Sequence, residues 1–476
     1  MLSDKIRQCF DLDKIAVVDE YGMHSYKELG IQVKHFQNFF EVNSARKVMI
    51  QLRQGFDAYS IILAAYLAGT EYCPIDVECP KDRIEYCKGV YNPDLVIVDE
   101  KLIDTWFSEN VYCVSQILEK DDATLIRKTK ECNSNAYTIF TSGSTGVPKG
   151  VSVSRHALEN FVNFGNKEYH IDIADVCSQF SNLTFDLSVF DIFMALSNGA
   201  MLVAFPSMFS RMIPDVLIEK YKITYWHSVP NVIHFFMKKE NIDLSSIRIF
   251  NFAGEAFGSA EAKFLFDKNR KCKIYNVFGH TETTFCMYQK LEYDTFLDFC
   301  DNTVSIGKTI PGYEVALKNV DDDGIGEIVI IGDEIAEGYL SEDEKKAFNK
   351  IQIANREYRY FVSGDYGYLK NGNMYFWGRK DDQCKIAGYR IDTNEIDKAC
   401  MELGMVSCTI SLEKKLYTFL LGTFSDEEML MAKKALSSKL ESYKVPSKII
   451  SIKEFPYNTN NKIDKKVLRE LITESM

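Results

Sequence analysis

The chain has 476 residues and a formal net charge of −12, with 46% apolar and 26% charged residues. This length is too great for one compact core, so two or three domains of ordinary globular composition are expected. The acidic balance argues against a general nucleic-acid binder. No apolar run reaches membrane-spanning length, and the first ten residues lack the apolar centre of a signal peptide. These features favour a cytoplasmic enzyme with neither a nucleic-acid nor a membrane partner.

The thirteen cysteines are scattered along the chain and form no C-x-x-C pair. Cys73 and Cys79 are the closest two, and no histidine cluster lies near them in the sequence. An odd number of cysteines in a large chain favours reduced thiols over a disulfide framework. No zinc site is expected.

Helical and strand patterns alternate along most of the chain. Ser25–Phe40 is predicted as an amphipathic helix, and Lys47–Gln51 and Leu95–Val98 are predicted as strands. Later apolar runs each predict a further strand: Met201–Phe205, Ile223–Trp226, Ile247–Ala253, Lys273–Val277 and Glu327–Ile331. This alternation predicts an α/β fold with layered sheets and helices.

A loop rich in glycine and hydroxyl residues, Thr141–Gly150, follows the apolar run Ala136–Phe140. Glycines let backbone N–H groups approach a ligand, and hydroxyls and a lysine add donors that suit phosphate oxygens. Such clusters are most often surface turns. The spacing also fails the P-loop pattern, because Val147 and Pro148 separate Gly146 from Lys149. Taken alone, the loop predicts only a phosphate-like ligand.

A domain boundary is predicted near residue 380. The charged segment Gly378–Gly388 is bounded by glycines, as segments that join domains often are. From Asp381 onward the chain holds 15 Lys and Arg and 15 Asp and Glu, so the excess acid lies in residues 1–380. We therefore expect a large N-terminal domain over 1–380 and a small α+β domain over 381–476.

Several motifs now occur in an order shared with one family. They are Tyr72–Asp76, the loop Thr141–Gly150, Phe185–Ser188, Asn276–Glu282, Gly326–Ile330, Gly338–Leu340, Ser363–Asp365, Gly378–Arg379 and Asn461–Asp464. From about residue 16 to 468 the chain resembles adenylate-forming enzymes, specifically the amino acid adenylation domains of nonribosomal peptide synthetases. Each motif alone is weak, but the ordered set is specific.

The resemblance implies a two-step ligase reaction with ATP and Mg²⁺ as cofactors. A carboxylate attacks the α-phosphate of ATP to give an acyl-adenylate and pyrophosphate, and a thiol then takes the acyl group. It also implies that residues 381–476 form a mobile lid, with its hinge at Asp381. The lid would bring Lys462 to the site to stabilise the charge that develops on the carboxylate and the α-phosphate.

The family's ATP-binding positions carry over residue by residue. They are Thr141, Ser142, Gly143, Ser144, Thr145, Gly146, Lys149, Asn276, Phe278, Gly279, Asp365 and Arg379. Lys462, Thr281 and Glu282 match catalytic positions, and Glu282 is also the expected Mg²⁺ ligand. Two positions depart from the family pattern: His280 replaces the usual proline, and Ala387 replaces the usual arginine.

The expected substrate is an amino acid, because Asp186 occupies the position that pairs with an α-ammonium group. The other substrate-binding positions are Phe185, Leu187, Phe190, His227, Asn251, Ala253, Gly254, Val277, Phe285 and Cys286. Since these are mostly apolar, a small or medium apolar amino acid such as alanine or proline is expected. The local motifs are similar to those of D-alanine–carrier protein ligases and of L-proline adenylating enzymes. His227 and Asn251 leave a polar side chain open.

The expected partner is a separate carrier protein with a phosphopantetheine arm, because the chain leaves no room for a carrier domain after Lys462 or for a condensation domain at its start, and a free-standing ligase is therefore expected. Carriers of this family are acidic, so we expect docking on the less acidic C-terminal domain, near Lys434, Lys439 and Lys444. An acyl- or aryl-CoA ligase and a non-catalytic scaffold are the alternatives. Asp186 argues against the first, and the intact motifs argue against the second.

Overall fold

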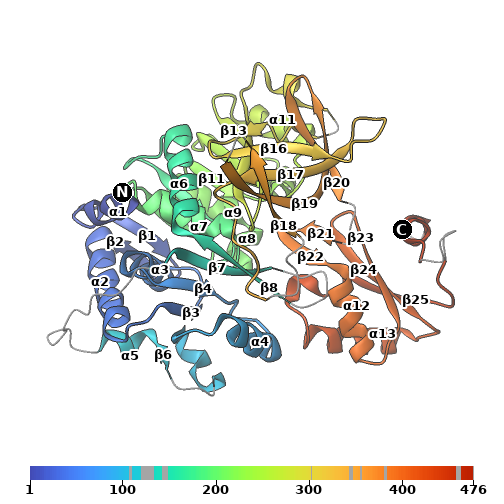
Figure 1. The fold of residues 1–476 in the computed structure, drawn as a ribbon, viewed down its shortest axis with the longest axis horizontal. Coiled ribbons are helices and arrows are strands. Elements are labelled where there is room, and N and C mark those ends of the chain that lie inside the picture. The colour runs from blue at the N-terminus through green and yellow to red at the C-terminus, as the bar shows by residue number, and fades with distance from the viewer. Residues whose placement is uncertain are drawn as a thin grey trace. The chain divides into compact units, whose positions relative to one another are not determined.

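A computed structural model describes residues 1–106, 110–119, 133–141, 148–301, 303–341, 347–353, 356–379, 383–456 and 463–474 (Figure 1). The chain divides into two compact units. The first comprises residues 1–77, 88–140 and 150–378, and the second comprises 78–87, 141–149 and 379–476. The short segments 78–87 and 141–149 therefore group with the C-terminal part of the chain, although both segments lie far from it in sequence.

The largest sheet of the first unit contains nine described strands in the order β15-β14-β13-β12-β11-β9-β10-β1-β2. Its strands are β1 (Ile15–Asp19), β2 (Gly22–Ser25), β9 (Val176–Gln179), β10 (Met201–Ala204), β11 (Tyr225–Ser228), β12 (Ile249–Ala253), β13 (Lys273–His280), β14 (Thr284–Leu291) and β15 (Lys308–Thr309). The run from β1 to β13 is parallel, and β2, β14 and β15 add antiparallel edges. In such sheets, ligands bind at the carboxyl ends of the parallel strands.

The second sheet has the order β6-β5-β3-β4-β7-β8. Its strands are β3 (Lys47–Gln51), β4 (Glu71–Pro74), β5 (Leu95–Val98), β6 (Val111–Cys113), β7 (Asn135–Thr141) and β8 (Lys149–Ser154). A third sheet consists of β16 (Tyr313–Lys318), β17 (Gly326–Gly332), β18 (Phe348–Ile353), β19 (Arg356–Lys370) and β20 (Asn373–Arg379).

Helices cover the two larger sheets. The helices of the first part of the chain are α1 (Leu2–Cys9), α2 (Tyr26–Val42), α3 (Phe56–Ala68), α4 (Lys81–Tyr91), α5 (Val114–Leu118), α6 (Arg155–Tyr169), α7 (Asp186–Leu196), α8 (Met208–Met212), α9 (Pro214–Tyr221), α10 (Ile233–Met237) and α11 (Ser259–Lys268). Ser25 caps α2 in a capping box with Glu28, and α3 ends at Gly69 in the left-handed conformation. α3 packs against both β1 and β4 (Figure 1). α7 packs against β9, β10 and β11.

The predicted elements are present, with small shifts at their ends. The predicted helix Ser25–Phe40 is α2, and the strand predictions for β3 and β5 agree with the observed bounds. β11 differs, because it begins at Tyr225 and not at Ile223. The backbone N–H of Ile223 donates to the carbonyl of Ile218 at the end of α9, so that residue closes the helix and does not enter the strand.

The second unit has its own core. It contains β21 (Gln383–Ile386), β22 (Tyr389–Asp392), α12 (Thr393–Glu402), β23 (Ser407–Leu412), β24 (Lys415–Leu421), α13 (Asp426–Ser437), β25 (Lys448–Ile452) and α14 (Lys465–Glu474). Ile391, Ile396, Leu416, Leu420 and Leu436 pack together inside it. This is a small α+β arrangement. Among the described helices of both units, none is long and apolar enough to cross a membrane.

A buried group of charges lies inside the second unit. Arg83 contacts Glu395 and Glu441, each at 2.6 Å, and Lys444 contacts Glu395 at 2.7 Å. Arg83 belongs to α4, whereas its partners belong to the C-terminal part of the chain. Burial lowers the pKa of Arg83, but Glu441 and Glu395 raise it by more, so the guanidinium stays charged. These ion pairs attach the segment 78–87 to the second unit.

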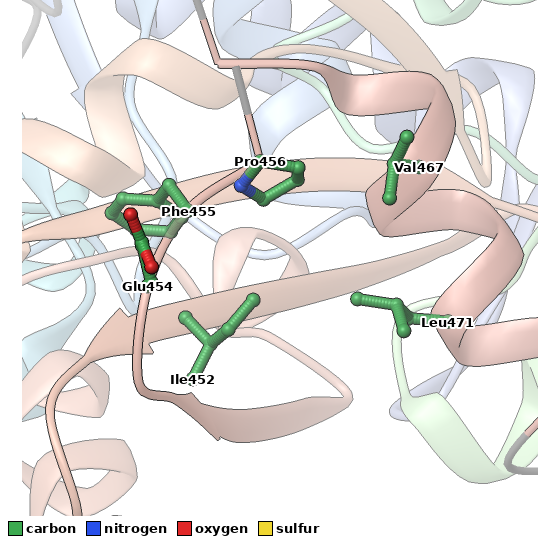
Figure 2. A pocket seen from close by; sticks show the side chains of 6 residues that line it. All are labelled: Ile452, Glu454, Phe455, Pro456, Val467 and Leu471. Carbon is green, nitrogen blue, oxygen red and sulfur yellow. The ribbon is translucent and has the colours of Figure 1, made fainter.

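A hollow of about 410 Å³ opens between the end of β25 and α14 (Figure 2). Val467 and Leu471 project into it from the helix, and the other lining residues are Ile452, Glu454, Phe455 and Pro456. Ile452 is the last residue of β25, and Glu454, Phe455 and Pro456 come after it. Except for the Glu454 carboxylate, the lining is apolar. In sequence, Pro456 and Ile463 flank residues 457–462, which lie outside the described residues and include Lys462.

Candidate active site

β13 and the turn that follows it bring together most of the candidate nucleotide residues of the first unit. Asn276 and Phe278 are buried on alternate positions of the strand, and Gly279 adjoins a bulge in the pairing with β14. The amide nitrogen of Asn276 donates to the carbonyls of Val304 and Ser305. These bonds orient the side-chain amide.

Gly279 is required for packing. A Cβ at this position would lie 1.8 Å from the carbonyl oxygen of Thr284 on the neighbouring strand, so any larger residue would push β13 and β14 apart. The close approach positions the rings of Phe278 and His280, whose centroids lie 5.2 Å apart in an edge-on arrangement. A flat ring beside a polar strand end suits adenine stacking.

His280 is hydrogen-bonded to Asp365, the residue that is expected to bind the ribose. Its Nε2 lies 2.8 Å from Oδ2 of Asp365 on β19, and both side chains are buried. The sequence alone identified His280 only as a departure from the usual proline. The structure shows that its imidazole contacts the Asp365 carboxylate directly.

Glu282 is almost completely buried in the turn after β13. Its Oε1 accepts a hydrogen bond of 2.8 Å from the Tyr339 hydroxyl, and its backbone carbonyl accepts one from Ala336. Thr281 precedes it and is half-buried. Within the described ranges no group of three or more His, Cys, Asp or Glu residues could hold a metal ion. The donor set fits a Mg²⁺ ion that takes one protein carboxylate and completes its shell with phosphate oxygens and water.

The phosphate-loop and hinge residues are only partly described. Thr141 ends β7 and Lys149 begins β8, and both group with the second unit. Arg379 ends β20 and is half-buried in the same unit. Ser142, Gly143, Ser144, Thr145, Gly146, Asp381 and Lys462 lie outside the described residues. Ala387 and Gly388 form the turn between β21 and β22, both with positive φ.

The substrate candidates converge on one face of the large sheet. His227 and Asn251 are register partners on the parallel strands β11 and β12, and Ala253 pairs with Val277 of β13 in the same way. Neighbouring residues in register project from the same face. α7 lies over this face and contributes Leu187 and Phe190, and β14 adds Phe285, whose ring packs against those of Phe190 and His227. Cys286 is the extra residue at the bulge, and its thiol donates to the carbonyl of Phe278. All eight of these side chains are buried.

Asp186 is less buried than these eight side chains. It is the first residue of α7, preceded by Phe185 at the N-cap, and it is half-buried. Burial and the nearby Asp186 carboxylate raise the pKa of the Tyr137 hydroxyl above its usual range. The positive end of the helix dipole favours an ionised carboxylate at this position. Gly254 follows β12 with φ of +87° and lets the backbone turn away from the strand end.

Sequence reasoning missed two residues that support the site. Asp191 of α7 contacts His227 at 2.6 Å, and Tyr339 holds Glu282. Asp191 was detectable in principle, since it is a single acid within the apolar run Val189–Phe193. A carboxylate in such a run is retained only when it has a partner. Tyr339 lies in the motif Gly338–Leu340, but that motif did not indicate its contact with Glu282, which is far away in sequence.

The chain was compared with known families and structures. The profile of the family described as AMP-binding enzyme matches residues 7–340. The chain belongs to this family. A D-alanine–D-alanyl carrier protein ligase of Bacillus licheniformis is 30% identical to this AMP-binding enzyme over 438 residues, which is 86% of each chain. A ligase of the same description from Listeria monocytogenes is 29% identical over 485 residues, 94% of each chain.

Solved structures show the same fold. The Vibrio cholerae adenylation domain AlmE, in complex with glycyl-adenosine-5'-phosphate, superposes with a TM-score of 0.85 at 22% identity, covering 99% of this AMP-binding enzyme and 98% of AlmE. The predicted resemblance and the predicted α/β fold with a large N-terminal and a small C-terminal domain are confirmed.

Proposed function

We propose that this AMP-binding enzyme is an ATP-dependent amino acid–carrier protein ligase. It joins the carboxylate of an amino acid to AMP, releases pyrophosphate, and then transfers the aminoacyl group to the phosphopantetheine thiol of a separate carrier protein. The observation that carries the proposal is Asp186, half-buried at the first turn of α7, the helix that also carries the buried candidates Leu187 and Phe190. The D-alanine–carrier protein ligases among the relatives support this choice.

In this proposal, Asp186 pairs with the α-ammonium group of the substrate. An acid that is partly removed from water is best retained by a cationic partner. A fatty or aryl acid has no such cation to offer to Asp186. This contrast argues against the alternative, an acyl- or aryl-CoA ligase.

The nucleotide residues orient ATP for an in-line attack. Phe278 stacks on the adenine, Asn276 lies beside it, and Asp365, held by His280, accepts hydrogen bonds from the ribose hydroxyls. Glu282 would hold Mg²⁺, which neutralises phosphate charge when bound. A substrate carboxylate oxygen then bonds to the α-phosphorus as the bond from phosphorus to the pyrophosphate oxygen breaks.

Residues 381–476, which form most of the second unit, are the proposed lid. Lys462 reaches the reacting carboxylate and α-phosphate for the first step, and Thr141, Lys149 and the glycine-rich loop between them bind the outer phosphates. In the second step the carrier thiol loses its proton and its sulfur bonds to the acyl carbon, while the acyl–oxygen bond to AMP breaks. The proposed domains remain 1–380 for the core and 381–476 for the lid.

The proposed carrier-docking surface needs one correction. Lys444 is completely buried, and its ammonium group lies between Glu395 and Glu441. It cannot attract a partner from solution. Lys434 is exposed and Lys439 pairs with Glu402 at the surface, so the docking hypothesis rests on these two lysines.

Amino-acid-dependent exchange of pyrophosphate into ATP tests the proposed function. The exchange should require an amino acid, and Lys462→Ala should slow it by about 10²-fold or more while leaving ATP binding in place. Lys465→Ala, three residues away, is the matched control and should keep the wild-type rate. Exchange that depends on a fatty or aryl acid would support the CoA ligase, and no exchange with any acid would support a non-catalytic scaffold.

A further inference from the structure

The floor of the substrate pocket holds a buried acid–imidazole pair. Nδ1 of His227 on β11 lies 2.6 Å from Oδ1 of Asp191 on α7, and neither side chain is exposed. Phe190 and Phe285 face the imidazole edge-on, each with its ring centroid 5.8 Å from that of His227. The pair is therefore removed from water and enclosed by rings.

The burial of Asp191 and His227 decides which protonation states of the pair are favoured. Burial raises the pKa of Asp191 to about 6, although His227 acts to lower it. A single net charge is costly in such a place, so the forms that carry no net charge are favoured. In one of them a neutral carboxyl donates to Nδ1, and in the other a carboxylate accepts from an imidazolium. In the form whose carboxyl donates to Nδ1, the ring proton lies on Nε2, which makes that atom a hydrogen-bond donor.

The Nε2 donor has no acceptor among the residues that the structure describes. Asn251, the register partner of His227 on β12, has the opposite lack: its acceptor atom has no donor in the described part of the chain. Its Nδ2 donates to the Tyr225 hydroxyl at 2.8 Å, and its Oδ1 receives no bond from any described group. Because buried polar atoms are nearly always hydrogen-bonded, one donor and one acceptor on the same face of the sheet call for a ligand that satisfies both.

We infer that His227 and Asn251 select a small amino acid whose side chain carries a hydroxyl group, with Asp191 as the positioning residue. This inference rests on the proposed function. The hydroxyl oxygen accepts from Nε2 of His227, and its proton is donated to Oδ1 of Asn251. An apolar side chain would leave both atoms without partners, so the apolar preference expected from pocket composition is replaced by a polar one.

The surrounding rings limit the substrate's size. Phe190 packs on Phe161 and Phe285, with centroid distances of 5.5 and 5.0 Å. It also fills the space above Gly165, where an added Cβ would lie 2.5 Å from the ring. Because these rings pack closely around His227, we expect the substrate side chain to be short, with its hydroxyl on a one- or two-carbon stem.

The test compares isosteric amino acids on the wild-type chain by pyrophosphate exchange. Serine is measured against 2-aminobutyrate and threonine against valine, each in L and D form, so that only a hydroxyl and a methyl group differ. A site that bonds a substrate hydroxyl should favour the hydroxyl member by more than about tenfold in kcat/KM. A smaller preference, or a preference for the methyl member, overturns the inference while the exchange itself upholds the proposed function. Absence of exchange with every amino acid overturns both.

Variants distinguish hydrogen bonding to the substrate hydroxyl from an effect of side-chain packing alone. His227→Phe keeps a ring but removes the donor, and it should bring the ratio of serine to 2-aminobutyrate close to one. Asp191→Asn can still donate to Nδ1 and should keep most of the preference, whereas Asp191→Leu should lose it. The control is Asp175→Asn, which breaks another half-buried contact of the same sheet, with Arg248. It should leave the ratio unchanged; an equal loss of the ratio in Asp175→Asn would overturn the positioning role of Asp191.

Discussion

Single side chains in this enzyme are held by partners that lie far away in the sequence. His280 and Asp365 are 85 residues apart, and Asp191 and His227 are 36 apart. In both pairs the imidazole is buried with a carboxylate. Each pair thus fixes the orientation of one group that is expected to contact a ligand.

The first prediction concerns His280. His280→Ala should raise the KM for ATP about tenfold with a smaller change in kcat, because a charge-assisted hydrogen bond of about 1.5–3 kcal/mol no longer orients Asp365. Asp365→Ala should cost more, since it removes the ribose contact itself. Steady-state exchange rates as a function of ATP concentration give both constants. An unchanged KM in His280→Ala would show that β19 alone orients the carboxylate.

The second prediction concerns pH and Asp191. Its pKa in the folded chain is about 6, above the ordinary value of 3.8, mainly because of burial. The folded state therefore binds a proton more tightly than the unfolded state does. The stability contributed by this group is complete below about pH 4 and is lost as pH rises through 6. Thermal midpoints from pH 4 to 7 should fall less steeply with pH in Asp191→Asn than in the wild type; parallel curves would contradict this.

At the scale of elements, close packing between α6 and α7 shapes the substrate pocket. Gly165 of α6 meets the Phe190 ring of α7, and Phe161 of α6 stacks on the same ring. The aromatic layer between the two helices and the sheet thus depends on one residue without a side chain.

The third prediction uses a pair of helix glycines. Gly165→Ala should destabilise the fold by about 1–3 kcal/mol, because its Cβ would overpack against Phe190. Gly89→Ala in α4 meets nothing within 4 Å and should be neutral or stabilising by about 0.5–1 kcal/mol. Chemical denaturation of both variants measures the difference. Equal effects would mean that Phe190 moves aside without cost.

The fourth prediction concerns the buried ion pairs of the second unit. Arg83→Ala leaves Glu395 and Glu441 with one cation fewer and should destabilise this unit by about 3–5 kcal/mol. Lys350→Ala breaks an exposed pair with Glu357 and should cost at most about 1 kcal/mol. Limited proteolysis and thermal unfolding report the change. A small effect of Arg83→Ala would show that Lys444 alone compensates both acids.

At the scale of the whole molecule, motif order was enough to predict the family, the α/β fold and the class of reaction. Periodicity predicted the strands, since apolar runs of four to six residues match β3, β5 and β10. The site was predicted less completely. Alignment identifies positions such as His227, but it does not show that Asp191 contacts it or that Lys444 is buried. Those facts depend on tertiary contacts between segments that are distant in sequence.

The division into two units also has consequences for function. Segments 78–87 and 141–149 group with the C-terminal part, so part of the phosphate loop belongs to the unit that carries the proposed catalytic lysine. Such an arrangement suits an enzyme that runs two half-reactions by moving a lid. Transfer to the carrier should therefore be separable from adenylation by substitution at the hinge Asp381.

Amino-acid-dependent ATP–pyrophosphate exchange by the full chain is the most direct test of the proposal that this enzyme activates an amino acid. We expect this exchange to require an amino acid and to be strongest with a small hydroxyl-bearing one. It should fall by about 10²-fold or more in Lys462→Ala. Exchange supported only by acids without an α-ammonium group, or an unchanged rate in Lys462→Ala, would contradict it.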